Sequence, residues 1–224
     1  MKSKFYLILI LFLLFSCKQN DNDIDFGYDY FPMDKGSFVV YEVTQISHAI
    51  NLNPQHDTLK YTLETVVGEE IVDNSGRPAR EFFQYKYELS SGELLDKRVW
   101  TKVIDGKRGE VVEENQRKIR MIFPVKEEDS WNVNAFNQED EQVVYYEKAN
   151  EARTIGGFVL ENTAKIVYDD FLTLVDYRKS HDTYAKGIGL VERKRKYLAI
   201  NSFDTLNINR GDEIHYKLLD YGKK

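Results

Sequence analysis

Apolar and polar side chains alternate along most of the chain with a period of two residues. In residues 58–67, one face carries Leu59, Tyr61, Leu63, Thr65 and Val67, and the other carries Lys60, Thr62 and Glu64. This pattern is typical of a β-strand with one buried face, because successive side chains of a strand point to opposite sides. The alternation predicts a strand here, and it recurs in residues 83–89, 119–123, 131–135 and 214–218.

Short runs rich in Gly, Asn, Asp and Ser separate these segments, at residues 73–76, 90–92, 105–106 and 156–157. Such residues tolerate the positive φ angles that hairpin turns need. No segment keeps a helical period over three turns. The two ambiguous segments, 94–104 and 162–172, favour strand because they are rich in Thr, Val and aromatic residues. We therefore expect a mainly β fold of antiparallel sheets with few or no helices.

Two stretches of the chain resemble each other. Residues 31–38 and 123–131 each contain a Phe-Pro pair, then a polar turn, then a Ser followed by an aromatic residue that opens a strand, namely Phe38 or Trp131. Proline ends strand pairing, and the aromatic residue can then enter the core. The match predicts two similar β halves, 30–122 and 123–224, within one domain of residues 30–224, arranged as a sandwich or a half-barrel. A chance match is the alternative.

The first residues have the pattern of a lipoprotein signal peptide. Lysines at positions 2 and 4 precede an unbroken apolar run over residues 5–15, then Ser16 and Cys17, which is the single Cys of the chain. An apolar run of this length is too short to span a bilayer as a helix. Peptidase cleavage of residues 1–16 would leave Cys17 as the acylated N-terminus. A buried core helix, or a secreted protein with an unpaired thiol, is the alternative.

Residues 17–29 form an acylated Cys followed by a polar and acidic tether. Lys18, rather than Asp, follows the Cys, which argues against retention in an inner membrane. Asp21, Asp23 and Asp25 imitate the start of a calcium loop, but Phe26 stands where that loop requires Gly. We therefore expect no calcium site there. The chain is predicted to be anchored in the cell envelope, at the outer membrane, on its periplasmic face or at the cell surface.

Several motifs together resemble a family of bacterial envelope proteins. They are residues 30–41, the later Phe-Pro turn that ends in Trp131, and residues 184–191. With the acidic tether, they resemble Bacteroidota-type envelope lipoproteins of unknown function with TapB-like β domains. The resemblance covers most of the chain beyond the tether. It implies a β architecture and a lipid anchor, and it assigns no catalytic residue.

Composition and charge narrow the function. The 224 residues carry 31 basic and 37 acidic side chains, a net charge of −6, and removal of residues 1–16 lowers it to about −8. This charge gives no global field that attracts nucleic acid, and one Cys cannot form a disulfide framework or a thiolate metal site. The apolar and aromatic content is high enough for a folded domain.

Candidate catalytic groups give weak signals. None of the four histidines, His48, His56, His181 and His215, forms a ligand pair with metal spacing. His56-Asp57 and His181-Asp182 have the order of orienting pairs in a triad, but no activated Ser accompanies them. Hydrated turn positions are the simpler explanation for these histidines. The acid pairs in 169–170 and 139–141 are expected in solvated turns.

Two further features have binding and structural explanations. The run 193–196 is basic, and alternation would place Arg193 and Arg195 on one face and Lys194 and Lys196 on the other. We expect an edge strand protected by charge, with an anionic headgroup or glycan site as the alternative. Trp100 and Trp131 could stack on sugars, but core packing is expected for both.

These observations predict a membrane-anchored envelope lipoprotein that acts by binding or assembly and is not an enzyme. No cofactor and no metal is expected, and Cys17 is the one site residue that the sequence assigns. The membrane is the expected partner, together with an envelope protein, a glycan or a lipid. A carrier that holds an acyl chain in a curved sheet is the alternative, and an unrecognised hydrolase is the rival class.

Overall fold

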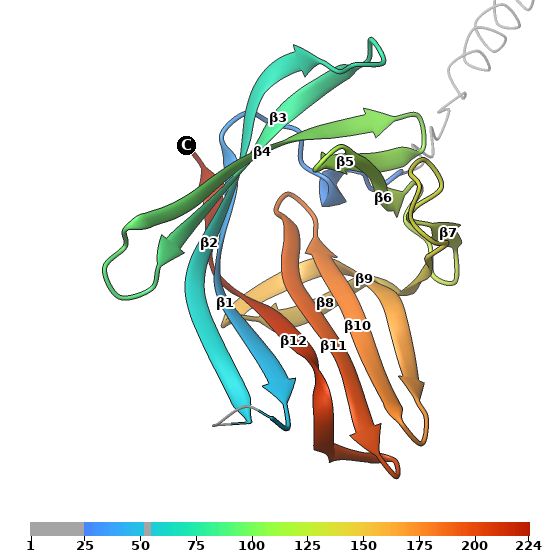
Figure 1. Ribbon diagram of the computed structural model, residues 1–224. Helices are drawn as coiled ribbons and strands as arrows, with labels where there is room; N and C mark the ends of the chain where they lie inside the picture. The colour runs from blue at the N-terminus through green and yellow to red at the C-terminus, as the bar shows by residue number, and fades with distance from the viewer. Residues whose placement is uncertain (1–24, 52–54) are drawn as a thin grey trace, which may run out of the picture.

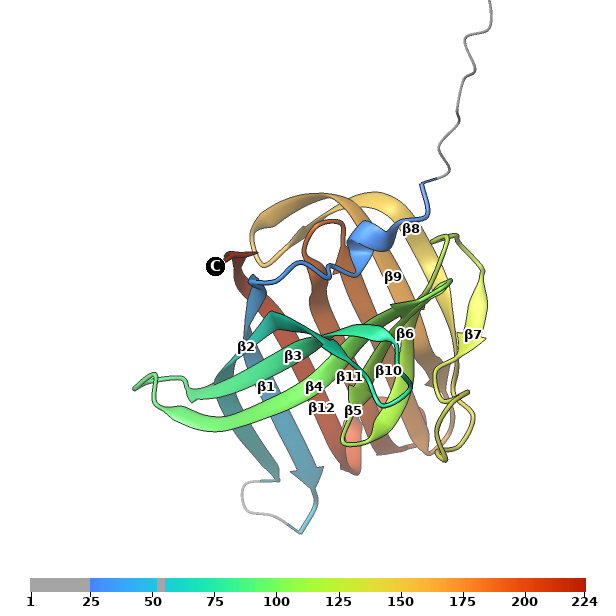
Figure 2. The ribbon, with the colours of Figure 1, turned by 90° about the horizontal axis from the view of Figure 1, so that it is seen from above.

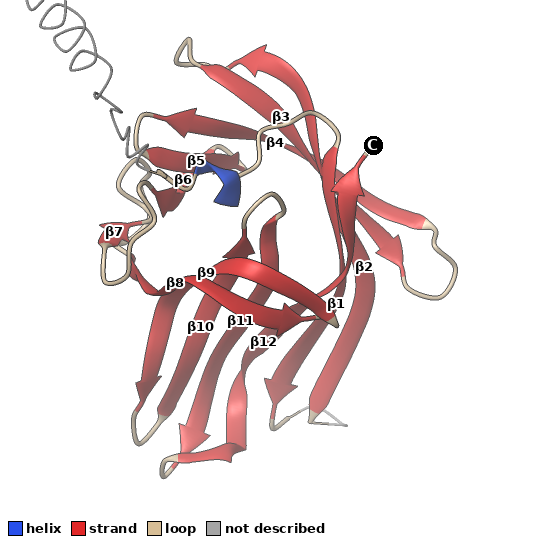
Figure 3. Ribbon diagram, turned by 180° about the vertical axis from the view of Figure 1, so that it is seen from behind, coloured by secondary structure: helices blue, strands red, loops and turns tan. Residues whose placement is uncertain are grey.

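The computed structural model describes residues 25–51 and 55–224, so the signal peptide, Cys17 and the tether up to residue 24 lie outside it. The described chain is almost entirely strand, with one short 3₁₀ helix, η2 (Tyr28–Tyr30), as Figure 3 shows. No helix in the described ranges is long and apolar enough to cross a membrane.

Twelve strands form a single antiparallel sheet in which strands consecutive in sequence pair, except β6 and β7 (Figure 1). β12 returns to pair with β1, so β6 and β7 are the two ends of the strand order. The strands are β1 (Ser37–Ala49), β2 (His56–Val72), β3 (Pro78–Glu88), β4 (Leu94–Asp105), β5 (Arg108–Glu113), β6 (Gln116–Ile122), β7 (Ser130–Asn132), β8 (Val143–Ile155), β9 (Phe158–Leu172), β10 (Asp176–Ala185), β11 (Gly189–Asn201) and β12 (Asp204–Lys223).

The sheet curls on itself until it is nearly closed, like a barrel, as the view from above shows (Figure 2). The prediction of a mainly β fold of antiparallel strands is confirmed. Of the two arrangements that the sequence left open, the structure has the curved one, because all twelve strands belong to one continuous sheet.

The predicted turns lie where the chain reverses. Residues 73–76 join β2 to β3, 90–92 join β3 to β4, 105–106 join β4 to β5, and 156–157 join β8 to β9. Position 156 requires glycine. A Cβ there would lie 2.3 Å from the carbonyl oxygen of Leu218, and the backbone φ of +63° is one that other residues rarely adopt. Both ambiguous segments are strands, in β4 and β9.

Alternation predicts the buried face well on some strands. In β2, Tyr61, Leu63 and Val67 are buried, whereas Leu59 is exposed near the start of the strand. In β6 and just after it, Ile119, Met121 and Phe123 are buried. Two groups of buried side chains fill the sheet interior, one around Trp131 and Tyr146 and the other around Tyr41 and Val43.

The predicted face of β3 is wrong. Phe83, Tyr85 and Tyr87 form a half-buried stack along one face, with successive ring centroids 6.0 and 6.4 Å apart. Phe82 and Gln84, on the other face, line the interior cavity. The aromatic stack is covered by Lys97, whose amine lies 5.0 Å from the Phe83 ring centroid. Aromatic residues do not by themselves indicate the buried face of this strand, because a lysine can cover aromatic rings at the surface.

The two Phe-Pro segments precede strands of very different length. β1, which Phe38 enters, has 13 residues, whereas β7, which contains Trp131, has 3. The predicted strand therefore ends before Ala135, which is exposed. Residues 30–122 contribute β1 to β6, and residues 123–224 contribute β7 to β12. The proposed duplication stays a prediction.

Candidate functional site

The N-terminal segment closes one end of the curled sheet. Residues from Asp25 onwards already contact the domain: the Asp25 carboxylate pairs with Lys186, and the Gly187 N–H donates to the Asp29 carbonyl at 2.8 Å. η2 follows and lies near the turn between β10 and β11 (Figure 1). This segment places Phe31, which is buried, against the sheet interior.

A cavity of about 60 Å³ lies in the interior beside Phe31. Its apolar wall contains Val39, Val67, Val111 and Leu190. The charged side chains of its polar wall come from four strands and are Lys102 from β4, Glu113 from β5, Arg120 from β6 and Arg193 from β11. Neutral polar groups are added by Ser37, Tyr41, Thr65, Gln84, Tyr184 and Tyr216. Charged groups from distant parts of the sequence therefore surround one small space.

Lys102 is the most unusual residue of this wall. Its side chain is buried, with 6% of the residue exposed, and no described side chain forms a hydrogen bond or ion pair with its amine. The amine lies 4.1 Å from the centroid of the Phe31 ring and 5.2 Å from that of Phe82. Burial lowers the pKa of Lys102 from 10.5 to about 7. The site therefore presents an amine that titrates near neutral pH.

The other buried charges of the interior are paired. Asp182 is fully buried, and it accepts two hydrogen bonds from Arg193, at 3.0 and 2.8 Å. Arg195 lies 2.7 Å from the same carboxylate, and Arg120 pairs with Glu113. Burial by itself would raise the pKa of Asp182, but the Arg193 and Arg195 guanidinium groups outweigh it and hold the pKa far below its ordinary value.

The pKa of Glu113 is set by the same two opposing effects. Burial would raise its pKa, but the charge of Arg120 and the hydrogen bond from it lower the pKa below its ordinary value. Both interior carboxylates are therefore ionised at neutral pH and already bound to arginines. Neither one is left to neutralise Lys102.

Trp100 also lines the cavity, two residues before Lys102 on β4. Its indole N–H is buried and has no hydrogen-bond acceptor among the described residues. Residues two apart on a strand share a face, so the two unpartnered donors are neighbours on one wall. A buried donor without an acceptor costs free energy, and such groups commonly mark a site that a ligand completes.

The four histidines lie on strands, so the expectation of turn positions is wrong. The Nδ1 atoms of His48 and His56 are hydrogen-bonded at 2.7 Å, and His48 Nε2 lies 3.2 Å from the Glu213 carboxylate. His181 and His215 flank Glu192, at 3.1 and 3.7 Å. Strand pairing brings these residues together, which their spacing in sequence could not show. None of them lines the interior cavity.

The suggested triad pairs do not form. Asp182 bonds Arg193 and Arg195 rather than its neighbour His181, because adjacent residues of β10 point to opposite faces. Within the described residues, no three His, Cys, Asp or Glu side chains gather as a metal site. Asp169 and Asp170 lie in β9 and not in a turn, whereas residues 139–141 are in the exposed segment between β7 and β8 as expected.

The basic run 193–196 lies in the middle of the sheet. β11 pairs with β10 on one side and β12 on the other, so the prediction of an edge strand is wrong. The division of faces is confirmed, since Arg193 and Arg195 reach Asp182. On the other face, Lys194 pairs with Glu192 at 2.6 Å and Lys196 pairs with Glu213 at 2.6 Å.

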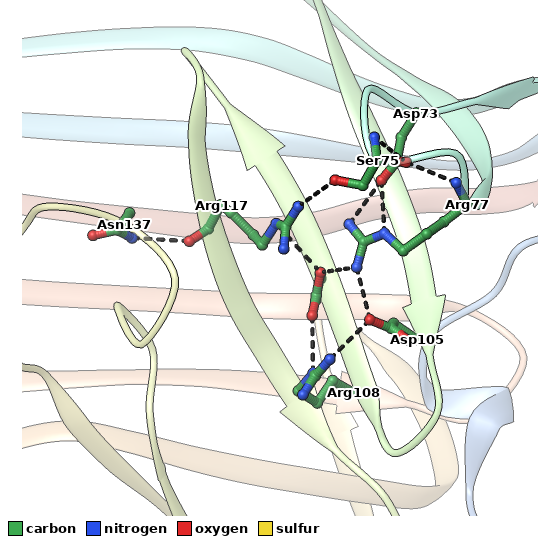
Figure 4. Close-up of polar contacts among 8 residues, drawn as sticks. Asp73, Ser75, Arg77, Asp105, Arg108, Arg117 and Asn137 are labelled. Atoms are coloured by element: carbon green, nitrogen blue, oxygen red, sulfur yellow. Dashed lines mark hydrogen bonds and ion pairs between the residues drawn. The ribbon is translucent and has the colours of Figure 1, made fainter.

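Another buried carboxylate, that of Glu110, holds three hairpins together outside the cavity (Figure 4). Glu110 is fully buried and lies 2.9 Å from Arg77 and from Arg108, and 3.7 Å from Arg117. The Asp105 carboxylate also forms ion pairs with Arg77 and Arg108, each at 2.8 Å. The Glu110 carboxylate is surrounded by cationic partners. This network therefore stabilises the packing of the hairpins and leaves no carboxylate free for a ligand.

Exposed apolar side chains gather at the end of the sheet away from the N-terminal segment. The turns after β1, β9 and β11 lie together there (Figure 1). They are joined by hydrogen bonds from the Ile50 N–H to the Asn209 carbonyl and from the Phe203 N–H to the Leu174 carbonyl. The exposed residues are Ile50, Phe171, Leu172, Leu174, Val175, Phe203 and Leu206. We call this surface the distal apolar tips.

Sequence reasoning missed Lys102, although a signal was present. Trp100, Lys102 and Ile104 alternate on one face of a predicted strand, so a lysine stands between two large apolar residues. Such a lysine is expected to be buried when its neighbours on the face are buried. The pairing of Arg120 with Glu113 gave no comparable signal, because it depends on the register between β5 and β6.

Comparison with known proteins finds a similar solved structure but no family. No protein-family model and no curated protein matches the chain. One solved structure, described as a "putative lipoprotein" from Parabacteroides distasonis, is similar over 86% of this chain and 98% of its own, with 12% sequence identity and a TM-score of 0.44.

Proposed function

We propose that this protein is a lipoprotein of the cell envelope, anchored through an acylated Cys17 in the outer membrane, and that it acts by binding without catalysis. The anchor is supported by the apolar run 5–15 followed by the single Cys of the chain. The resemblance to envelope lipoproteins with TapB-like β domains belongs to the same proposal.

The observation that carries the binding role is the unpartnered amine of Lys102 in the wall of the interior cavity. An unpaired buried ammonium is costly to keep, so a ligand that pairs with it would recover free energy. No histidine lines this cavity, which favours binding over acid-base hydrolysis. A cavity of about 60 Å³ is far smaller than a typical ligand pocket of several hundred Å³, which argues against the acyl-chain carrier.

Filling the cavity tests this role. In Val111→Phe a ring would enter the cavity, whereas Val112→Phe, the matched control, changes the neighbouring residue on the opposite face of β5. Small molecules would be extracted from each protein after purification from membranes in nonionic detergent, and quantified by mass spectrometry. We expect a compound bound to the wild type and to Val112→Phe, and absent from Val111→Phe. Equal amounts in all three proteins would overturn the proposal, and so would a wild type that neither carries a small molecule nor binds one on titration.

An assembly role is the second candidate, and the distal apolar tips favour it. The described chain begins at the other end of the sheet, so a membrane anchor on that side would leave the tips facing away from the membrane (Figure 1). Exposed apolar clusters of this kind commonly mark protein interfaces. If the tips bind another protein, chemical crosslinking on whole cells should give an adduct of the wild type. The double variant Phe203→Glu, Leu206→Glu should not form that adduct. An unchanged adduct pattern would exclude the tips as an interface.

A further inference from the structure

The charges around the cavity are unbalanced in favour of cations. Arg120, Arg193 and Arg195 face two carboxylates, Glu113 and Asp182, before the amine of Lys102 is counted. The whole chain is acidic, with a net charge of −6, so this surplus is local to the interior. Buried charge is expensive unless it is paired, so the interior is complementary to an anion.

The free donors define where that anion would bind. The amine of Lys102 has three N–H groups and faces the ring of Phe31, which attracts a cation but accepts no strong hydrogen bond. The indole N–H of Trp100, on the same face of β4, is the second donor without an acceptor. Arg120 and Arg193 also line the cavity, and some of their N–H groups are engaged by Glu113 and Asp182.

The number of donors and the size of the space limit the ligand class. A carboxylate has two oxygens and one charge, which match one amine and one indole N–H. Phosphate presents more oxygens and a second charge, so it is kept as a probe, and a preference for it would count against the carboxylate. A space of about 60 Å³ admits a group of a few heavy atoms, and Val39, Val67 and Val111 offer contacts to a short hydrocarbon.

We propose that the cavity is a binding site for a small monocarboxylate, whose oxygens accept hydrogen bonds from Lys102 and Trp100 and whose short apolar part packs against the valine wall. This assignment rests on the proposed binding function and names its ligand. The carboxylate would neutralise Lys102, which has no ion-pair partner among the residues that the structure describes.

Calorimetric titration of the full chain in nonionic detergent tests the assignment. The probes are acetate, propionate, the neutral analogue propionamide, and inorganic phosphate. The variants are Lys102→Met, which keeps the apolar stem, and Lys97→Met, a control that removes an exposed lysine from the same strand. We expect the wild type and Lys97→Met to bind propionate at least tenfold more tightly than propionamide or phosphate. Lys102→Met should lose that preference.

Trp100→Phe gives a second measurement that does not depend on the lysine variant. It keeps an aromatic ring and removes the indole N–H, so propionate affinity should fall severalfold while propionamide binding changes less. Equal affinity for propionate and propionamide, or a preference for phosphate, would overturn the carboxylate assignment but leave a binding cavity in place. If none of the four probes binds and no compound is extracted from the purified protein, the cavity holds water only, and both proposals fail.

Discussion

Trp131 donates its indole N–H to the carbonyl oxygen of Ile119, at 3.0 Å, across the gap between β6 and β7. These two strands are the ends of the sheet and do not form a regular ladder. Tyr146 adds to the junction, because its hydroxyl donates to the Ile122 carbonyl at 2.8 Å and accepts from the Ile122 N–H at 3.1 Å. Side chains thus satisfy backbone groups that an unpaired edge strand would expose.

The first prediction concerns this junction. Trp131 is buried and packs on Tyr146, with ring centroids 4.8 Å apart. Trp131→Ala should lower the free energy of unfolding by about 3 to 5 kcal/mol, because it removes a buried aromatic side chain. Trp131→Phe should cost less, since it keeps a ring and loses the hydrogen bond. Denaturant unfolding measures both. Phe136→Ala, at an exposed aromatic nearby, should change stability little, and equal losses for both alanine variants would contradict the core assignment.

The second prediction concerns the buried ion cluster. Asp182→Asn would leave Arg193 and Arg195 without their carboxylate, so the free energy of unfolding should fall by about 3 to 5 kcal/mol. Asp170→Asn is the control, because that exposed carboxylate lies 3.9 Å from Lys179. It should have almost no effect. Thermal and denaturant unfolding at neutral pH would compare the two, and a harmless Asp182→Asn would show that the cluster contributes nothing.

The same cluster sets an acid dependence with a definite sign. The folded pKa of Asp182 is lowered because Arg193 and Arg195 outweigh the opposing effect of burial. Its stabilisation is therefore fully present above the ordinary Asp pKa of 3.8, and it is lost progressively as the pH falls below that value. The stability difference between the wild type and Asp182→Asn should shrink in acid.

The third prediction is that Lys102→Met stabilises the ligand-free protein. Burial lowers the folded pKa of Lys102 from 10.5 to about 7, a shift equivalent to on the order of 5 kcal/mol. Between about pH 7 and 10.5 the unfolded chain holds a proton that the folded chain has released, so the stability of the wild type rises with pH. Below about pH 7 the full penalty is present and constant.

The gain in stability from Lys102→Met should therefore be largest below about pH 7 and disappear towards pH 10.5. Unfolding of both proteins at several pH values checks this. The other titratable or charged groups at the cavity are the same in both proteins, so the difference isolates the lysine; they are Tyr41, Glu113, Arg120, Tyr184, Arg193 and Tyr216. Lys97→Met should show no comparable gain, and a Lys102→Met protein that is less stable at pH 6 would contradict the prediction.

The fourth prediction concerns the anchor. Cys17→Ser removes the thiol that would receive the lipid, so the protein should leave the membrane fraction after carbonate washing. Ser16→Ala is the matched control, because it keeps a small residue before the Cys and should leave the protein in the membrane fraction. Cell fractionation followed by immunoblotting measures both. A Cys17→Ser protein that stays wholly with membranes would show that acylation is not the anchor.

The sequence by itself determined the class of fold and the positions of its turns. Period-two alternation predicted β2, β6 and β12, and small polar residues placed the turns at 73–76 and 156–157. These features are local, because side-chain alternation and positive φ angles are properties of a few adjacent residues. The same local reasoning predicted the buried Trp131.

Tertiary structure alone decided which distant residues meet. Arg193 was assigned to an edge strand, yet β11 lies in the middle of the sheet and Asp182 on β10 binds its guanidinium. Lys102, Arg120 and Tyr184 share one cavity although they come from strands far apart in the chain. Strand order and register, which depend on the curvature of the whole sheet, set these contacts, and no spacing along one segment encodes them.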